Sequence, residues 1–227
     1  MTYRRPTFFG MAYAARLFGE IETSRSLPKL REDVGLHPDI RNRQHAIEVL
    51  CWLNKWGCRI TKDRFGVIAN MLSAWFHQHR DRLPRGNLET LQDHELDALA
   101  LAYEELLFIE EFGPTAAAKA LFVVCPEAAI PWDKAIQDTF GLAGRTGRQY
   151  HGMLVRSRDE AGALVADAAR CGFPDAQSIM AAIGSEARTI PELLDQYHWI
   201  TISRGHRIPD RGELNRWMAW ERREAMA

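Results

Sequence analysis

Apolar residues recur at three- and four-residue steps along most of the chain, which is the spacing of one face of an α-helix. Besides a hairpin around residues 93–124, the pattern predicts helices over residues 7–21, 40–54, 63–79, 149–171, 174–183, 190–199 and 210–225. Residues 28–40 are interpreted as a loop, and residues 200–203 as one short strand or the end of a helix. No other strand pattern stands out, so we expect an all-α fold.

The hairpin has the strongest pattern in the chain. Leu96, Leu99, Tyr103, Leu106 and Leu107 form the apolar stripe of its first helix, which leads into a Glu-Phe-Gly-Pro turn at 111–114. Gly113 suits the N-cap of the next helix, and Pro114 suits its first position because its φ is fixed and it has no N–H to leave unpaired. The second helix is predicted over 116–124. Free amides at its start are suited to bind an anion such as a DNA phosphate.

Short motifs here share their order and spacing with a known family. Phe112-Gly113 match the second half of that family's hairpin motif, and Ala116-Ala117 stand near its Thr-Ala. The loop Ile130-Pro131-Trp132-Asp133 is similar to its apolar-Val-Asp segment, Ile136 fits the apolar residue that follows, and Asp133 comes 18 residues after Thr115. Together these motifs resemble the helix-hairpin-helix DNA glycosylases, which excise bases from DNA.

The resemblance implies a single two-lobed helical domain over residues 1–227, with the hairpin and aspartate loop at about 93–140 and a C-terminal helical part at about 148–227. It implies that Asp133 is the catalytic carboxylate, whose charge stabilises the oxocarbenium-like transition state of base release. An N-cap role for Asp133 is compatible with that function. Gly113, Thr115 and Ala116 would contact DNA, and Trp132 would line the base pocket.

Two positions depart from the family. Glu111 stands where the family has its first hairpin glycine, which brings a carboxylate to the expected phosphate site. Thr115 stands where bifunctional members carry a lysine nucleophile, so we expect a monofunctional glycosylase without lyase activity. Lys119 and Lys134 are interpreted as ordinary surface lysines. The alternative is a non-catalytic DNA- or partner-binding protein of the same fold, which Glu111 favours.

The formal net charge of −1 hides strong segregation of charge. Residues 41–85 carry nine Lys/Arg and three acids, whereas residues 86–118 carry eight acids and no Lys or Arg. Such asymmetry is able to attract DNA to one side of a protein, although the acidic run is interpreted as a solvated helix face. Loop arginines suit phosphate contact, so Arg145, Arg148, Arg204 and Arg207 are our further DNA-binding candidates.

Composition excludes several classes of protein. No run of 18 apolar residues is present and the N-terminus lacks the apolar region of a signal peptide, so we expect a cytoplasmic protein without a membrane partner. The four cysteines form no Cys-x-x-Cys pair and only Cys171 lies in the last third, which argues against zinc or iron–sulfur ligation. We expect no cofactor and no metal.

Overall fold

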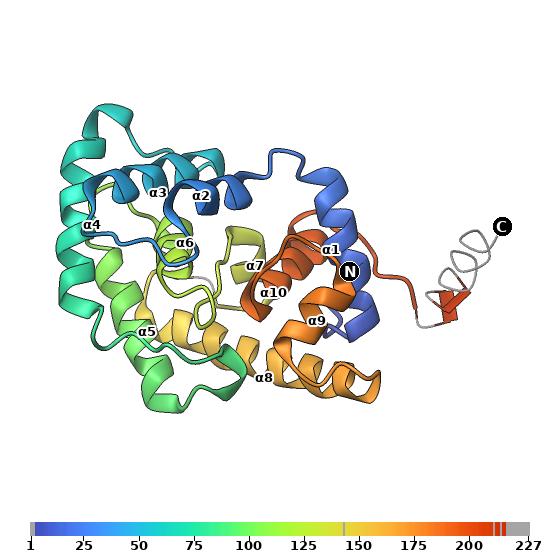
Figure 1. Ribbon diagram of the computed structural model, residues 1–227. Coiled ribbons are helices and arrows are strands. Elements are labelled where there is room, and N and C mark those ends of the chain that lie inside the picture. Colours follow the sequence, from blue (N-terminus) through green and yellow to red (C-terminus); the bar gives the residue numbers. More distant parts are fainter. Residues whose placement is uncertain (1–2, 143, 211, 214, 217–227) are drawn as a thin grey trace.

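The computed structural model describes residues 3–142, 144–210, 212–213 and 215–216, and every regular element within them is helical, as predicted. The elements are α1 (Phe8–Ile21), α2 (Ser26–Val34), α3 (Arg43–Lys55), the 3₁₀ turn η1 (Lys62–Arg64), α4 (Phe65–His79), the 3₁₀ turn η2 (Leu88–Thr90), α5 (Asp93–Leu106), α6 (Pro114–Val124), α7 (Lys134–Thr139), α8 (Gly147–Arg170), α9 (Ala176–Ile183), α10 (Ile190–His198) and the π-helical turn η3 (Trp199–Ser203). Figure 1 shows how they are arranged.

One group of helices is built from α2 to α6. Helix α3 packs against α2, α4 and α6, and α5 packs against α4 and α6. Helix α2 corrects the prediction of a loop over 28–40. Pro28 is the third residue of this helix, and a proline is tolerated in the first turn because the amide it lacks has no partner there.

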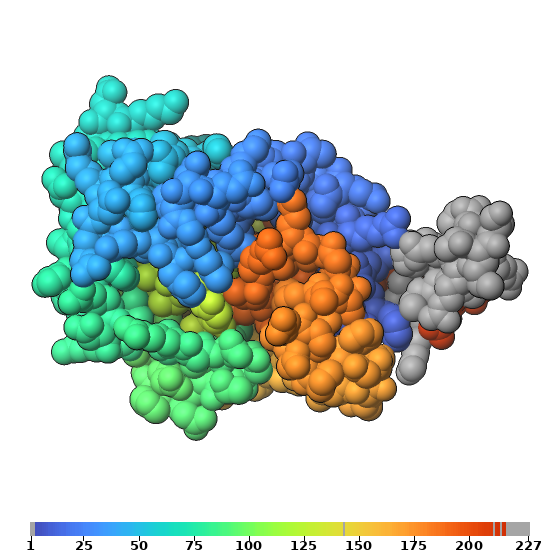
Figure 2. Space-filling model, viewed as in Figure 1, coloured from blue at the N-terminus to red at the C-terminus, as the bar shows by residue number. Residues whose placement is uncertain are grey.

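A second group contains helices from both ends of the chain. Helix α1 packs against α9, α10 and η3, so the N-terminal helix lies beside the C-terminal ones (Figure 1). The 24-residue helix α8 runs along both groups, contacting α5 and η2 as well as α1, α9 and α10. Buried residues of both groups form one hydrophobic core, to which α8 contributes Tyr150, Leu154, Ala161 and Leu164. The surface is hollowed where the blue, green and orange parts of the chain meet in Figure 2.

The structure decides between the two interpretations of residues 200–203, a short strand or the end of a helix. Residues 200–203 continue α10 as the turn η3 and form no strand. Asp210 caps the start of the next helical turn, since its Oδ1 accepts a hydrogen bond from the Glu213 amide (2.8 Å). The rest of the helix predicted over 210–225 lies outside the described residues. None of the described helices combines the length and the apolar character needed to cross a membrane.

Candidate functional site

The hairpin begins its second helix where the sequence predicts. Gly113 is the N-cap of α6 and Pro114 its first residue. Helix α5, however, ends at Leu106, so the connection spans residues 107–113 and is longer than the predicted four-residue turn. Within it, Glu111 adopts a left-handed backbone with φ of 67°, a conformation that favours glycine. Glu111 therefore takes the backbone geometry that a glycine at this position would supply.

The two carboxylates of the connection bind protein groups. Glu111 Oε2 accepts a hydrogen bond from the Thr61 amide (2.6 Å), and Glu110 forms a two-pronged ion pair with Arg64. The neighbouring acidic run is also engaged, since Asp93 pairs with Arg158 (2.7 Å) and Glu105 contacts His79 (2.8 Å). The charges of Arg64 and Arg158 offset part of the negative charge that would otherwise repel DNA from the hairpin.

Arg145 lies beside the start of α6. Its Nη2 donates to the carbonyl of Phe112 (3.4 Å), which brings the exposed loop before α8 next to the hairpin. Thr146 caps α8, and Arg148 is exposed in its first turn. The positive ends of two helices and two arginine side chains therefore gather in one part of the structure, an arrangement that suits phosphate binding.

Asp133 is the N-cap of α7, as expected. Its Oδ1 accepts from the Ile136 amide (2.9 Å), and its Oδ2 accepts from the Ser203 hydroxyl (2.5 Å) at the end of η3. Asp133 is half-buried, so its carboxylate is neither sealed in the core nor free to rotate. Ser203 thereby joins the loop between α6 and α7 to the C-terminal helices, a contact that no local pattern indicates.

A surface depression of about 420 Å³ lies next to this contact. Its lining includes Ser203, Arg204, Trp56 and Trp199. The Arg204 guanidinium lies 4.3 Å from the centre of the Trp199 ring, and Arg204 is exposed. Arg207 has a different environment, because its guanidinium binds both oxygens of Glu213 (2.8 and 3.0 Å). Of Arg204 and Arg207, only Arg204 has a side chain without a carboxylate partner among the described residues, and its neighbour Ser203 contacts Asp133.

Trp132 is placed differently from our expectation. Its side chain is 1% exposed and packs edge-on against Tyr103 and Tyr150, which stack on each other. A ring enclosed in this way offers no free face to a base. Trp132 therefore belongs to the core behind the Asp133 loop and does not line a base pocket in this structure.

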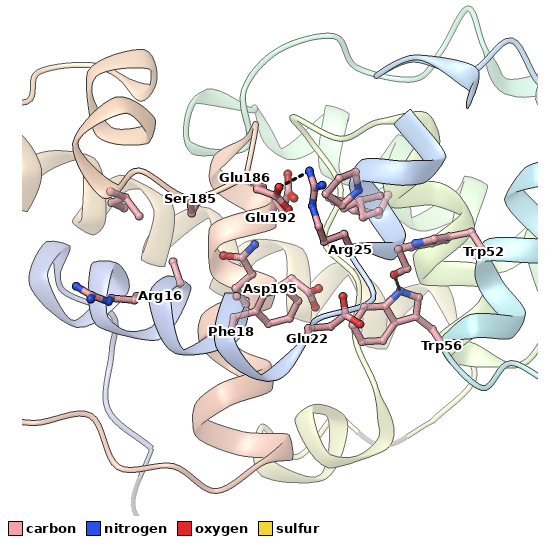
Figure 3. Close-up of a pocket in the computed structure, with 18 of the residues that line it drawn as sticks. Arg16, Phe18, Glu22, Arg25, Trp52, Trp56, Ser185, Glu186, Glu192 and Asp195 are labelled. Atoms are coloured by element: carbon pink, nitrogen blue, oxygen red, sulfur yellow. Dashed lines mark hydrogen bonds and ion pairs between the residues drawn. The ribbon is translucent and has the colours of Figure 1, made fainter. Parts of the chain in front are cut away.

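The sequence analysis did not anticipate a cavity of about 520 Å³ between the two helix groups (Figure 3). Trp52 and Trp56 form one side, α1 and the 184–186 turn form others, and Asp195 and Gln196 project from α10. Trp56, Ser26 and Glu22 line both this cavity and the smaller depression, so the two are adjacent. The Trp56 indole N–H donates to Ser26 Oγ (2.9 Å).

Lys119 lies in this cavity and is only 6% exposed. Its Nζ is 4.3 Å from the centre of the Trp56 ring and 5.7 Å from that of Trp52, within the range of cation–π contacts. The prediction that Lys119 is a surface lysine is wrong. Residues 116–118 and 120–123 are all buried, and a helix apolar on every side is enclosed, so the lysine within it is enclosed too. Lys134, by contrast, is exposed and paired with Asp138 (2.5 Å).

Asp195 supplies a carboxylate to the same cavity. Desolvation by the surrounding protein raises its pKa to about 6, an effect that the charge of Lys119 partly offsets and that Asp133 reinforces. A carboxylate whose pKa is raised at a concave site is a common feature of functional sites.

We expect Asp195→Asn to stabilise the protein at pH 7 by about 1–2 kcal/mol. A rise of the pKa from 3.8 to about 6 corresponds to a loss of at most roughly 3 kcal/mol in the free energy of unfolding. We expect a smaller effect because the Asp195 side chain keeps some solvent contact. Because the pKa is raised in the folded protein, the ionised Asp195 carboxylate destabilises the fold above about pH 6. Below about pH 4 this carboxyl group is protonated in both the folded and the unfolded protein, and its effect disappears. Urea unfolding at pH 4 and 7.5 should therefore show the gain mainly at pH 7.5. A variant less stable than wild type at pH 7.5 would contradict the assignment.

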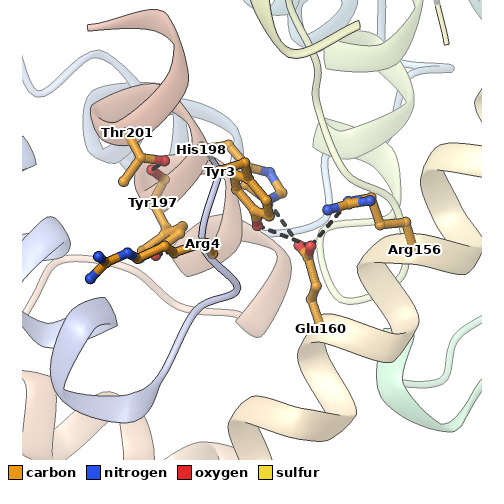
Figure 4. A network of polar contacts seen from close by, with 7 residues as sticks. All are labelled: Tyr3, Arg4, Arg156, Glu160, Tyr197, His198 and Thr201. Atoms are coloured by element: carbon orange, nitrogen blue, oxygen red, sulfur yellow. Dashed lines mark hydrogen bonds and ion pairs between the residues drawn. The ribbon is translucent and has the colours of Figure 1, made fainter. Parts of the chain in front are cut away.

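A second polar cluster joins the N-terminal segment to α8 and α10 (Figure 4). Glu160, on α8, is 1% exposed and contacts Tyr3 (2.9 Å), Arg156 (3.1 Å) and the fully buried His198 (2.9 Å). Arg156 also stacks on Phe140, at 3.9 Å from the ring centre. His198 directly precedes η3, so this cluster anchors the start of the π-helical turn. Ser203, the last residue of that turn, contacts Asp133.

Comparisons with protein-family models, curated protein sequences and solved structures gave no significant match to this chain. Within the part of the chain that the structure describes, no three His, Cys, Asp or Glu side chains are grouped to hold a metal ion. Function is therefore argued from the site alone.

Proposed function

We propose that the protein is a monofunctional DNA glycosylase-like enzyme that releases a modified or mispaired base. The observation that carries this proposal is the half-buried Asp133 carboxylate, held by one amide and one hydroxyl at the start of α7 beside an aromatic-lined depression. Cleavage of an N-glycosidic bond builds positive charge on the sugar. A fixed negative charge at that point stabilises the transition state without reorganising during the reaction.

The hairpin and its surroundings supply the DNA-binding part of the proposal. Gly113, Thr115 and Ala116 lie at the start of α6, where amides are available to phosphate oxygens. Arg145 and Arg148 lie at the start of α8, and Arg204 lies next to Ser203. The base would flip out of the DNA duplex and enter the depression and the adjoining cavity, which share Trp56 as a lining residue.

The proposal is tested by incubating the protein with a panel of duplexes that each carry one modified or mispaired base. Alkali then cleaves any abasic site that has formed. Strand breaks that appear only after alkali support a monofunctional glycosylase, which releases the base but does not cut the strand. We expect this result because Thr115 has no amine with which to form the imine that strand cleavage requires. A break before alkali, or a covalent adduct trapped by borohydride, would contradict the monofunctional assignment and would implicate Lys119 or Lys134.

The second candidate function is binding without catalysis. Its support is the acidic run at 86–118, which still contributes exposed carboxylates such as Asp97 on the first hairpin helix, α5. Duplex binding without release of any base would favour this candidate. Association that is independent of salt concentration would indicate a protein partner, since phosphate contacts release counterions and weaken as salt rises.

We expect the double substitution Arg145→Ala and Arg148→Ala to weaken duplex binding about tenfold or more at 0.1 M salt, equally for all sequences. Each lost phosphate contact reduces the slope of log affinity against log salt by about 0.9. Fluorescence anisotropy across a salt series measures both quantities. The matched control is Lys29→Ala with Arg170→Ala, which removes the same charge from exposed positions on α2 and at the end of α8. An equal loss in the control would show that net charge, and not the hairpin surface, determines affinity.

A further inference from the structure

The chain between α3 and η1 carries exposed positive charge that has no role in the site described above. This basic connection (residues 55–62) runs from the last residue of α3 to the first residue of η1. It contains Lys55, Arg59 and Lys62, all of them exposed, and no acid. None of these three side chains has a carboxylate partner among the described residues. Their charge is therefore available to an anionic partner.

The backbone of the basic connection is held in place by side chains. Asn54 accepts a hydrogen bond from the Ile60 amide (2.7 Å) and donates one to the Ile60 carbonyl (2.6 Å). The Trp56 indole N–H donates to Ser26 Oγ (2.9 Å). Between these contacts Arg59 has a φ of 58°, in the left-handed region that favours glycine. Backbone strain of this kind costs stability and is concentrated at functional sites.

The basic connection contacts both parts of the proposed site. Near one end, the Thr61 amide donates to Glu111 Oε2 (2.6 Å), which holds this end against the hairpin. At the other end, Lys55 lines the depression of about 420 Å³, as does Ser203, whose hydroxyl contacts Asp133. The basic connection therefore extends from the hairpin to the depression beside the candidate catalytic carboxylate.

Two of the three cations act on one neighbourhood. Burial and then Glu48 raise the pKa of the Cys51 thiol, whereas the charges of Lys55 and Lys62 both lower it. The two ammonium groups thus lie near the same thiol, although they are seven positions apart in the sequence. The neighbouring acids are Glu48 and the exposed Asp63, so the three cations keep the local charge positive. Grouped cations of this kind suit phosphate oxygens.

From these observations we propose that the basic connection is a second DNA-contacting element, in which Lys55, Arg59 and Lys62 bind backbone phosphates beside the hairpin. This inference rests on the proposed function, and it adds the element that binds the strand between the hairpin and Asp133. Phosphate contacts fix the position of a protein on DNA without reading its sequence. Since Asn54 and Glu111 already hold the backbone, binding requires little further ordering of the chain.

Arg59→Gly is the first test, because glycine adopts the left-handed backbone without strain. The variant should fold as well as the wild type, and its melting temperature is measured alongside binding. We expect duplex binding at about 0.1 M salt to weaken about fivefold or more, and the slope of log affinity against log salt to fall by about 0.9. Arg59→Lys keeps the charge and should retain most of the affinity.

The matched control is Arg82→Gly. Arg82 is an exposed arginine of the same basic stretch, but it follows the opposite end of α4, and a helix of 15 residues is about 22 Å long. We expect its affinity for the duplex to stay close to that of the wild type. An equal loss in Arg59→Gly and Arg82→Gly would overturn the inference, because net charge alone would then explain the effect.

Neutral phosphates locate the contact on the DNA. Each duplex of a series carries one uncharged methylphosphonate in place of one phosphate. Where this change weakens binding of the wild type, at least one of Lys55→Gln, Arg59→Gly and Lys62→Gln should be less sensitive to it, because the contact is already missing. Effects that add at every position would overturn the inference, and so would the absence of duplex binding.

Binding and base release are measured separately, so the inference and the proposed function fail separately. Coupling between the variants and particular phosphates without base release would leave the DNA contact standing and would remove the glycosylase activity. Base release with an affinity unchanged in all three variants would do the reverse.

Discussion

Replacing Asp133 with Asn is expected to slow base release by about two orders of magnitude or more and to leave duplex binding unchanged. Asparagine keeps the size of the side chain, and its amide oxygen still accepts the bond from the Ile136 amide that caps α7. The substitution removes the negative charge that an oxocarbenium-like transition state requires. Loss of one preorganised electrostatic contact commonly costs about 10²–10³ in rate. Single-turnover release of the base measures the chemical step directly.

The matched control for this prediction is Asp175→Asn. Asp175 is also an N-cap, at the start of α9, and its Oδ1 accepts from the Ser178 amide (2.8 Å). It is exposed and lies outside both the cavity and the depression. Unchanged base release in Asp133→Asn would remove Asp133 from the mechanism. An equal fall in both variants would indicate that helix capping, and not the charge near the sugar, is responsible.

Replacing Glu160 with Leu is expected to reduce the free energy of unfolding by about 3–5 kcal/mol, which is the usual cost of removing one partner of a buried ion pair. The substitution leaves Arg156, the fully buried His198 and the Tyr3 hydroxyl without their shared acceptor. Urea unfolding at pH 7 measures the loss. Asp159→Leu is the control, because Asp159 is the preceding residue of the same helix and is exposed, and we expect a change within about 0.5 kcal/mol.

The pH dependence of this effect has a defined sign. Burial raises the pKa of Glu160, but hydrogen bonds from His198 and Tyr3 and the charge of Arg156 outweigh burial, so the net pKa is below the usual value. A lowered carboxyl pKa stabilises the fold above the unfolded value of about 4.3 and loses that contribution as the pH falls through the folded pKa. The difference between wild type and Glu160→Leu should therefore shrink below about pH 4. A difference under 1 kcal/mol at pH 7 would show that the cluster contributes little to stability.

The correct sequence predictions are those that depend on local chain geometry. Gly113 and Pro114 start α6, and Asp133 caps α7, because the φ of proline and the reach of a capping carboxylate depend only on neighbouring residues. The all-helical fold likewise follows from apolar spacing within each segment. Helix α2 was missed because residues 28–40 were interpreted as a loop, although Pro28 lies in the first turn of the helix, where a proline is tolerated.

The tertiary structure decided everything that depends on which helices lie side by side. Lys119 was interpreted as a surface lysine, but the packing of the helices encloses it in a cavity. Trp132 was interpreted as a wall of a base pocket, but it lies in the core. Asp195 was not considered, yet it lines the same cavity as Lys119. The Ser203–Asp133 and Glu160–His198 contacts join residues 70 and 38 positions apart. Sequence spacing determines where a helix begins and which face is apolar, but burial and pKa depend on partners that only the folded chain brings together.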